Sequence, residues 1–301
     1  MTPRLVVVAG PTGTGKSDLG IRLAARLGGE VINADSMQLY RGMDIGTAKV
    51  PPADRCGVTH HLLDVLDVRQ PASVARYQQQ ARSVIERLLA AGRTPILVGG
   101  SGLYIQSVID EIDFPGTDPA TRERYLTQVQ EQGAEAVHEL LAGLDPAAAA
   151  SIMPSDGRRI ARALEVLEIT GKPFTATLPA LDPARYGAVV LTLDRDTARL
   201  DRTVAGRVET MMAAGFLDEV RRLLDAGLRD GSTARRALGY PQLTAVIDGV
   251  ATVEQAVLDT VTATRRFVRR QRSWFRRDSR RHDLDADDPG LLDAALARIG
   301  R

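Results

Sequence analysis

Short apolar runs alternate with helical periods over the first hundred residues of the chain. The runs are bounded by glycine or polar residues, as buried strands are, and lie at residues 5–8, 31–34, 62–66 and 96–98. Between them, apolar residues recur with the spacing of one helix face at residues 19–27 and 74–89. This alternation predicts an α/β fold, in which helices cover a parallel sheet and ligand groups gather at the carboxyl ends of the strands.

The pattern changes at residues 114–186, where helical spacing continues and no convincing strand is present. One helix of this region has Ser155 or Asp156 as its N-terminal cap and ends at Gly171. We therefore expect a helical insertion domain, residues 114–186, within an α/β core formed by residues 1–113 and 187–301.

A later apolar run at residues 188–193 returns the chain to the sheet. Long helical periods follow it at residues 197–215, 216–226 and 253–277. The segment at residues 283–288 is acidic, and we expect it to be exposed.

The first apolar run leads directly into a glycine-rich loop, VAGPTGTGKS at residues 8–17. A strand before it and a helix after it are the context of a phosphate-binding loop, so we expect a P-loop NTPase-like core. The glycines let backbone N–H groups point inward, Lys16 reaches the terminal phosphates, and the Ser17 hydroxyl suits Mg²⁺. The residues expected to bind the phosphates are Gly10, Pro11, Thr12, Gly13, Thr14, Gly15, Lys16 and Ser17. The motif predicts a di- or triphosphate without identifying ATP.

The carboxylate that usually accompanies such a loop is displaced in this sequence. ATPases and kinases place an aspartate at the end of a second apolar strand, where it holds the Mg²⁺ shell. Here the run at residues 96–98 leads into two glycines and then Ser101. Asp35 instead follows another predicted strand, which ends at the same edge of the sheet. This suggests an acid beside a bound phosphate; the alternative is that Asp35 and Ser36 cap a turn.

Composition narrows the class of protein. The 39 basic and 38 acidic residues among 301 leave a net charge of +1, so a nucleic-acid surface must come from local clustering. The single cysteine, Cys56, excludes a disulfide framework and a cysteine-rich zinc site. Together with the lack of a long apolar stretch, it leads us to expect a cytoplasmic protein.

Such a cluster lies near the C-terminus, where residues 265–281 contain nine arginines and one acid, Asp278. Four of them share one face if the segment is helical, which suits a phosphate backbone: Arg265, Arg269, Arg272 and Arg276. Trp274 or Phe275 would pack below this face or stack on a base. The alternative is a solvated helix, or one paired with the acidic segment.

His60 and His61 raise a further alternative. Adjacent histidines suggest a metal site, but no cysteine or nearby carboxylate completes one. Packing, or a hydrogen bond near Asp64, is the interpretation that we favour.

Taken together, the motifs resemble those of the tRNA dimethylallyltransferases, the IPP transferase family. They follow the order and spacing of that family over residues 6–277: GPTGTGKS at 10–17, DSMQLYRGMDIGTAK at 35–49, HH at 60–61, VGGSGLY at 98–104, RRIARALEV at 158–166 with TGK at 170–172, ALGYPQ at 237–242, and RRQRSWFRR at 269–277. Ser101 stands where the family usually has threonine.

The resemblance implies a prenyl transfer from dimethylallyl diphosphate to the N6 amine of the adenosine on the 3′ side of the anticodon. The glycine-rich loop would then hold diphosphate as a leaving group, with Mg²⁺ at Ser17. Asp35 would accept or orient the amine proton, and Ser101 and Arg207 would complete the catalytic set. A kinase that binds a nucleotide such as ATP, and a non-catalytic RNA-binding module, are the alternatives.

The resemblance also implies a set of tRNA contacts, with the insertion acting as a clamp on the anticodon stem-loop. They are Asp35, Ser36, Met37, Gln38, Ser101, Arg122, Arg159, Ile160, Ala161, Arg162, Ala163, Gly239, Tyr240, Gln242, Arg269, Gln271, Arg272, Trp274 and Arg276. We expect a monomer that binds no membrane.

Overall fold

The computed structural model describes residues 3–174 and 184–300. Its centre is a six-stranded parallel sheet with the strand order β3-β2-β4-β1-β5-β6. The strands are β1 (Val6–Ala9), β2 (Glu30–Asn33), β3 (His60–His61), β4 (Pro95–Gly99), β5 (Val189–Asp194) and β6 (Arg281–Asp285). The predicted α/β class with a parallel sheet is confirmed.

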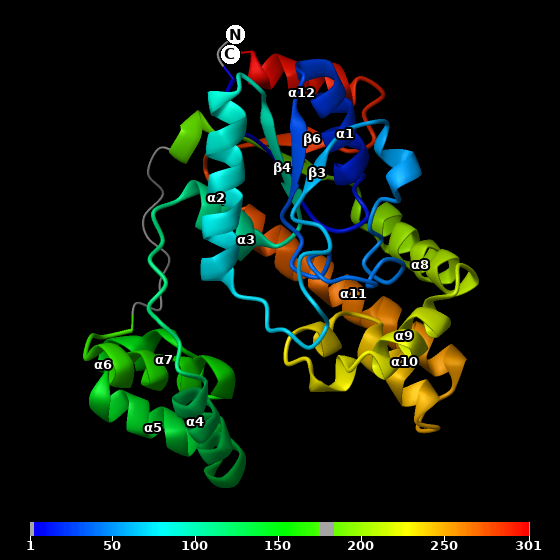
Figure 1. Cartoon of the computed structure of the whole chain (residues 1–301). Helices are drawn as coiled ribbons and strands as arrows, with labels where there is room; N and C mark the ends of the chain where they lie inside the picture. The colour runs from blue at the N-terminus through cyan, green and yellow to red at the C-terminus, as the bar shows by residue number, and fades with distance from the viewer. Residues whose placement is uncertain (1–2, 175–183, 301) are drawn as a thin grey trace. The chain divides into compact units, whose positions relative to one another are not determined.

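Helices cover both faces of this sheet (Figure 1). On one face, Val7 and Ala9 of β1 belong to the core that contains α2 (Val74–Ala90) and α3 (Gly102–Ile109). The alternate residues Val6 and Val8 belong to the second core, with α1 (Lys16–Leu27) and α12 (Leu291–Ile299). Burial on both faces explains why the strands read as continuous apolar runs rather than as alternating patterns.

The predicted strand at residues 62–66 is wrong. The structure places a two-residue strand, β3, just before it. Leu62 and Asp64 have φ values of 59° and 58°, which lie outside the extended region, so the strand cannot continue through them. Leu66 forms only an isolated bridge with Tyr40.

The acidic segment at residues 283–288, which we expected to be exposed, is exposed only in part. Residues 281–285 form β6, which pairs with β5 at the edge of the sheet and buries Leu284. The strand was not predicted because charged residues flank Leu284. At the edge of a sheet such residues can occupy the positions that are exposed to water.

Four α-helices lie between β5 and β6: α8 (Thr197–Ala213), α9 (Phe216–Asp225), α10 (Tyr240–Ile247) and α11 (Val253–Phe275). The three helices predicted in this part of the chain match α8, α9 and α11 to within a few residues. Leu200 and Val204 of α8 pack against Val268 of α11. Short 3-10 turns occur at Pro52–Arg55, Arg185–Gly187, Leu228–Asp230 and Ala234–Arg236.

The chain divides into two compact units: Met1–Glu111 with Leu181–Arg301, and Ile112–Ala180. The second unit contains four helices in its described part: α4 (Pro119–Gln132), α5 (Ala134–Leu144), α6 (Pro146–Ser151) and α7 (Gly157–Thr170). It has a core of its own, to which Val137, Leu141 and Ile160 belong. The predicted ends of α7 are confirmed, with Asp156 as the N-terminal cap and Gly171 in a left-handed conformation.

Among the described residues, no helix combines the length and the apolar character needed to cross a lipid bilayer.

Candidate active site

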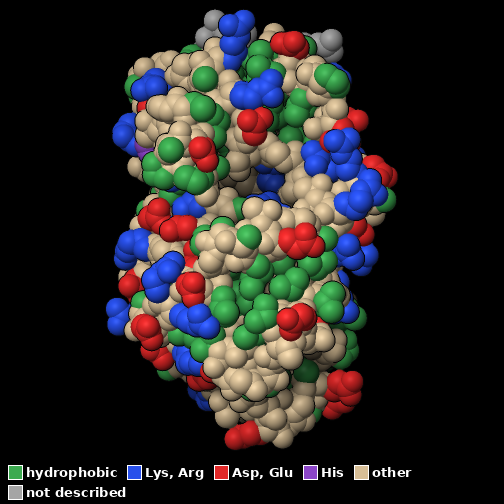
Figure 2. All heavy atoms as spheres, turned by 90° about the vertical axis from the view of Figure 1, so that its right-hand side faces the viewer, with side chains coloured by type: hydrophobic (Ala, Val, Ile, Leu, Met, Phe, Trp, Pro, Cys, Tyr) green, Lys and Arg blue, Asp and Glu red, His purple; other side chains and the backbone are tan. Residues whose placement is uncertain are grey.

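A cavity of about 800 Å³ opens at the carboxyl edge of the sheet, within the first unit. The loop after β1 and the residues that follow β2 and β4 form one part of its wall, and α8, α11, Phe216 and residues 236–238 form another. Figure 2 shows a hollow on this side of the molecule, with basic side chains inside it. The location is the one that the topology of a parallel sheet favours for a ligand.

The loop after β1 has the geometry of a phosphate cradle. Gly10, Gly13 and Gly15 have φ values of 138°, 87° and 81°, which residues with a Cβ rarely adopt. A Cβ at Gly10 would lie 2.2 Å from the carbonyl oxygen of Leu193. The Thr14 hydroxyl donates to the Pro11 carbonyl over 2.9 Å, and α1 begins directly after the loop. The predicted order of strand, loop and helix is confirmed.

Two cations, Lys16 and Arg207, line the cavity together. Burial lowers the pKa of Lys16 to about 7, Asp35 opposes this shift, and Arg207 adds to it. Burial also lowers the pKa of Arg207, again against the effect of Asp35. The Arg207 Nη1 donates to the Thr12 hydroxyl over 3.2 Å, and the Lys16 ammonium donates to the Pro11 carbonyl over 2.7 Å. Both basic groups are desolvated, and Asp35 only partly offsets the fall in their pKa values. A bound anion would stabilise their charged forms, so the pair forms a site for an anion.

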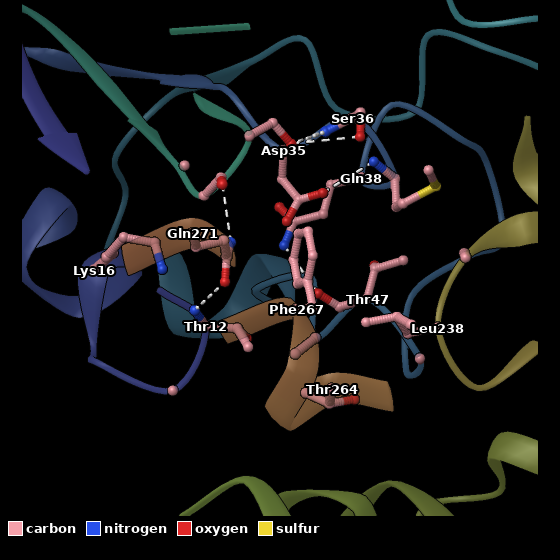
Figure 3. A pocket seen from close by; sticks show the side chains of 18 of the residues that line it. Thr12, Lys16, Asp35, Ser36, Gln38, Thr47, Leu238, Thr264, Phe267 and Gln271 are labelled. Carbon is pink, nitrogen blue, oxygen red and sulfur yellow. Dashed lines mark hydrogen bonds between the residues drawn. The ribbon is translucent and has the colours of Figure 1, made fainter. Parts of the chain in front are cut away.

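Asp35 lies at the end of β2 and points into the same cavity (Figure 3). Its Oδ1 accepts a hydrogen bond from the Met37 backbone N–H over 2.9 Å, and its own N–H donates to the Asn33 side chain over 2.9 Å. The two interpretations of Asp35 are therefore compatible, because the side chain caps a turn and lines the cavity at once.

Ser101, which follows β4, is hydrogen-bonded to Ser36, which follows β2. Its Oγ accepts from the Ser36 N–H over 3.2 Å and lies 3.4 Å from the Ser36 hydroxyl. Gly99 permits this approach, because a Cβ there would lie 2.2 Å from the carbonyl oxygen of Ala34. Ser36, Ser101 and Asp35 thus form one polar wall of the cavity.

Residues 46–48 line the cavity opposite the phosphate loop, and the loop at residues 44–48 to which they belong is held by Glu219, which was not expected from the sequence. Glu219 of α9 is 1% exposed. Its carboxylate accepts from the N–H groups of residues 44, 45 and 46 at 3.0, 2.7 and 3.1 Å, and from the Tyr240 hydroxyl at 2.7 Å. The signal was present, because Glu219 lies on the apolar stripe that Phe216, Val220 and Leu223 define.

The predicted tRNA contacts at residues 239–242 have internal roles in the structure. Tyr240 is fully buried against Phe216, with ring centroids 5.1 Å apart, and burial raises the pKa of its hydroxyl well above the usual value. The Gln242 side chain accepts from the Gly239 N–H over 3.0 Å. Their neighbours Ala237 and Leu238 line the cavity instead.

The arginines of α11 fall into two groups. Arg269 and Arg276 are exposed. Arg272 is 11% exposed and forms an ion pair of 2.7 Å with Asp194, while Arg265 donates to the Asp201 carbonyl over 3.2 Å. The predicted face of four equivalent arginines therefore needs correction, because two of them fasten α11 to neighbouring segments.

Several side chains of α11 line the cavity, among them Phe267, Arg270, Gln271 and Trp274. Trp274 lines the cavity and packs against Gly102, where a Cβ would lie 2.2 Å from the indole ring. Phe267 and Arg270 line it as well. Gln271 reaches the phosphate loop, with its Oε1 accepting from the Thr12 N–H over 3.0 Å.

In the second unit, most of the predicted RNA contacts point inward. Ile160, Ala161 and Ala163 are fully buried. Arg122 and Arg162 both pair with the buried Glu165, at 2.6 and 2.8 Å. The basic side chains at the start of α7 that are exposed are Arg158 and Arg159. The predicted contacts through the buried side chains and the two paired arginines are thus corrected, because those groups serve the core of the unit.

Each of the adjacent histidines has a partner within the fold. His60 Nδ1 lies 2.9 Å from the Val58 carbonyl oxygen, and burial lowers the pKa of its ring. His61 pairs with Glu30 at 2.5 Å rather than with a group near Asp64. Within residues 3–174 and 184–300, no group of three or more histidine, cysteine or acidic side chains is arranged to hold a metal ion.

Comparison with known proteins identifies related chains. A family model described as IPP transferase matches residues 38–278. The tRNA dimethylallyltransferase of Nocardia farcinica is 54% identical over 295 residues, which cover 98% of this chain and 94% of the relative. That of Streptomyces griseus is 60% identical over 278 residues, covering 92% of this chain and 89% of the relative.

Solved structures give the same picture. The full-length tRNA isopentenylpyrophosphate transferase of Bacillus halodurans has a TM-score of 0.73 and 36% identity, covering 99% of this chain and 96% of the other. A eukaryotic dimethylallyltransferase acting on tRNA has a TM-score of 0.81 and 26% identity, covering 99% of this chain and 77% of the other. The relatives thus share both sequence and fold with nearly the whole chain.

Proposed function

This chain belongs to the IPP transferase family, and from this premise we propose that it prenylates tRNA. The donor is dimethylallyl diphosphate, and the acceptor is the N6 amine of the adenosine on the 3′ side of the anticodon. The observation that carries the proposal is that the phosphate loop and Asp35 line one cavity. The donor, bound at the phosphate loop, and the acceptor, bound beside Asp35, can therefore react within the same cavity.

The diphosphate lies against the loop after β1. Residues of the loop, together with Lys16 and Arg207, line this part of the cavity and supply positive groups for the diphosphate. Apolar side chains of α8, Val204, Val208 and Met211, line the wall beside Arg207 and offer a surface for the five-carbon chain. This arrangement puts the positive charge where negative charge develops as the diphosphate departs.

The adenine enters from the side of Asp35 and Ser101. As the N6 nitrogen forms its bond to the allylic carbon, the bond from that carbon to the diphosphate oxygen breaks and its electrons leave with the diphosphate. The amine then carries a surplus proton, which passes to the Asp35 carboxylate. One oxygen of this carboxylate is fixed by the turn to Met37, so the group presents a defined face to the amine.

Ser17 is the residue that would hold Mg²⁺ at this site. It lines the cavity at the first turn of α1, directly after Lys16. A lone hydroxyl suits this ion, because Mg²⁺ keeps several waters and takes its other ligands from substrate phosphates. When bound, the ion would supply further charge neutralisation at the diphosphate.

The tRNA is held by basic side chains on both units. In the first unit these are the exposed Arg269 of α11 and Arg276, which directly follows this helix. On the insertion, which we propose acts as a clamp on the anticodon stem-loop, they are Arg158 and Arg159. Extracting the adenine from its stack costs about a few kcal/mol, which contacts to the surrounding phosphates must offset. A monomeric, cytoplasmic enzyme remains our expectation from the sequence.

Product analysis tests this function. The protein is incubated with unmodified tRNA, Mg²⁺ and either dimethylallyl diphosphate or ATP, and the RNA is digested for mass spectrometry. We expect one prenyl group on a single adenosine and release of diphosphate. Formation of ADP without a modified base would support a kinase instead, and a stable RNA complex without product would support a passive binding module.

A further inference from the structure

Gln271 of α11 connects three parts of the active site. It is 5% exposed and lies in the arginine-rich helix, far in sequence from the other groups that it contacts. Its Oε1 accepts from the Thr12 backbone N–H of the phosphate loop over 3.0 Å. Its Nε2 donates to the Gly100 carbonyl over 2.8 Å, one residue before Ser101. Figure 3 shows the side chain lying between the loop and the end of β4.

The partners fix the orientation of this amide. An N–H group can only donate and a carbonyl can only accept, so the two ends of the Gln271 side chain are not interchangeable. Gly100 has no side chain, and a Cβ there would lie 2.4 Å from Gln271 Nε2. A glycine at position 100 is therefore what allows the Gln271 amide to lie against this strand end.

The phosphate loop needs such an anchor. Three of its residues are glycines with positive φ, and glycine loses more conformational freedom on folding than any other residue. The loop ends are fixed by β1 and α1, but Thr12 lies between them. Gln271 holds the Thr12 N–H and Arg207 holds the Thr12 hydroxyl, over 3.0 and 3.2 Å. A loop held in one conformation binds an anion without a further loss of entropy.

We propose that Gln271 is a positioning residue for the diphosphate loop rather than a direct contact of the tRNA. It fastens Thr12 and the strand end before Ser101 to α11, so that the loop is formed before either substrate arrives. The inference rests on the proposed function, because it takes the ligand of this loop to be a diphosphate. A direct RNA contact would have only the second N–H of Nε2 and the second lone pair of Oε1 to use, because one of each is engaged within the protein.

Binding measurements distinguish the two roles. Gln271→Met keeps the size of the side chain and removes both hydrogen bonds. We expect inorganic diphosphate with Mg²⁺ to bind the free protein about tenfold more weakly, because a buried N–H and a buried carbonyl lose their partners. The affinity for an anticodon stem-loop RNA should stay within about twofold of the unaltered value. In turnover, KM for dimethylallyl diphosphate should rise while KM for tRNA does not.

Gly100→Ala approaches the same contact from the other side. Its methyl group displaces Nε2, so it should weaken diphosphate binding much as Gln271→Met does. In a Gln271→Ala background it should add little, because nothing remains to be displaced. This non-additivity separates a specific contact from general damage to the cavity. The control is Gln255→Met, an exposed glutamine of the same helix, which should change neither affinity.

Weaker RNA binding with unchanged diphosphate binding would overturn the proposal, since it would make Gln271 an RNA contact. Unchanged affinity for both ligands would overturn it as well. Thermal unfolding of each variant shows whether the variant is folded at the temperature of the binding measurement. A loss of affinity in a folded variant can then be assigned to the lost contact. Failure of the unaltered protein to prenylate tRNA contradicts the proposed function instead, and this readout does not depend on any variant.

Discussion

At the scale of single residues, the account depends on the division of charge within one cavity. Lys16 and Arg207 provide the positive groups, and Asp35 provides an acceptor across from them. The phosphate-loop motif identified Lys16, and Asp35 follows a predicted strand at the same edge of the sheet, whereas Arg207 was expected only from the family resemblance. The apolar stripe of α9 indicates that Glu219 is buried, but its backbone partners and the partners of Gln271 could not be found, because they are more than a hundred residues away in the chain.

Asp35→Asn tests the proton acceptor. The amide keeps the size of the side chain and can still accept from the Met37 N–H, but it cannot take up a proton. We expect kcat to fall by about 10² to 10⁴, with a much smaller change in KM for either substrate. Steady-state kinetics with each substrate varied in turn measures this split. A variant with normal kcat and raised KM would show that Asp35 binds the base without accepting its proton.

At the scale of elements, two helices between β5 and β6, α9 and α11, shape the cavity in different ways. The buried Glu219 of α9 fixes the loop at residues 44–46, and α11 presents Trp274 and Gln271 to the cavity. Amphipathic periodicity predicted both helices with nearly correct ends. It could not assign the arginines of α11, because the partners Asp194 and Asp201 become neighbours only in the folded chain.

Glu219→Gln tests the support of the 44–46 loop. A glutamine replaces one acceptor oxygen by an N–H₂ group, which faces backbone N–H donors that then lose their partner. We expect the free energy of unfolding to fall by about 2 to 3 kcal/mol. The matched control is Asp218→Asn, an exposed neighbour that pairs with Arg221 over 2.7 Å. Denaturant unfolding of both variants measures the difference, and equal stabilities would remove Glu219 from this role.

The two groups of arginines on α11 predict different outcomes. Neutralising the exposed pair with Arg269→Gln and Arg276→Gln should raise KM for tRNA and reduce the slope of log affinity against log salt by about one per contact. Dimethylallyl diphosphate affinity should not change. Arg272→Gln should lower the unfolding temperature instead, because it leaves Asp194 without its ion pair. Equal salt slopes before and after the exposed pair is neutralised would exclude these two residues from the RNA surface.

At the scale of the whole molecule, the chain builds two units with separate cores. The sequence indicated the change of pattern at residue 114, because strands stop there and helical spacing continues. It could not predict that Glu165 would be buried as the centre of the second unit, where it accepts from the Asp118 N–H over 2.8 Å and pairs with two arginines. A charged residue in a helix ordinarily reads as exposed.

Glu165→Gln tests the independence of the two units. Removing the charge leaves Arg122 and Arg162 without their buried partner, which should destabilise the second unit by about 2 to 3 kcal/mol. Hydrogen exchange should become faster in peptides from residues 117–170 and remain unchanged around the cavity. The control is Glu168→Gln, an exposed residue of the same helix. Equal acceleration in both units would show that they unfold as one.

The central claim is that the leaving diphosphate and the attacking amine share the cavity at the carboxyl edge of the sheet. A structure with an unreactive analogue of dimethylallyl diphosphate and an anticodon stem-loop tests it most directly. We predict the diphosphate on the loop after β1, with the adenine N6 about 3 to 3.5 Å from the allylic carbon and within hydrogen-bond reach of Asp35. A diphosphate bound elsewhere, or an adenine that remains outside the cavity, would contradict the account.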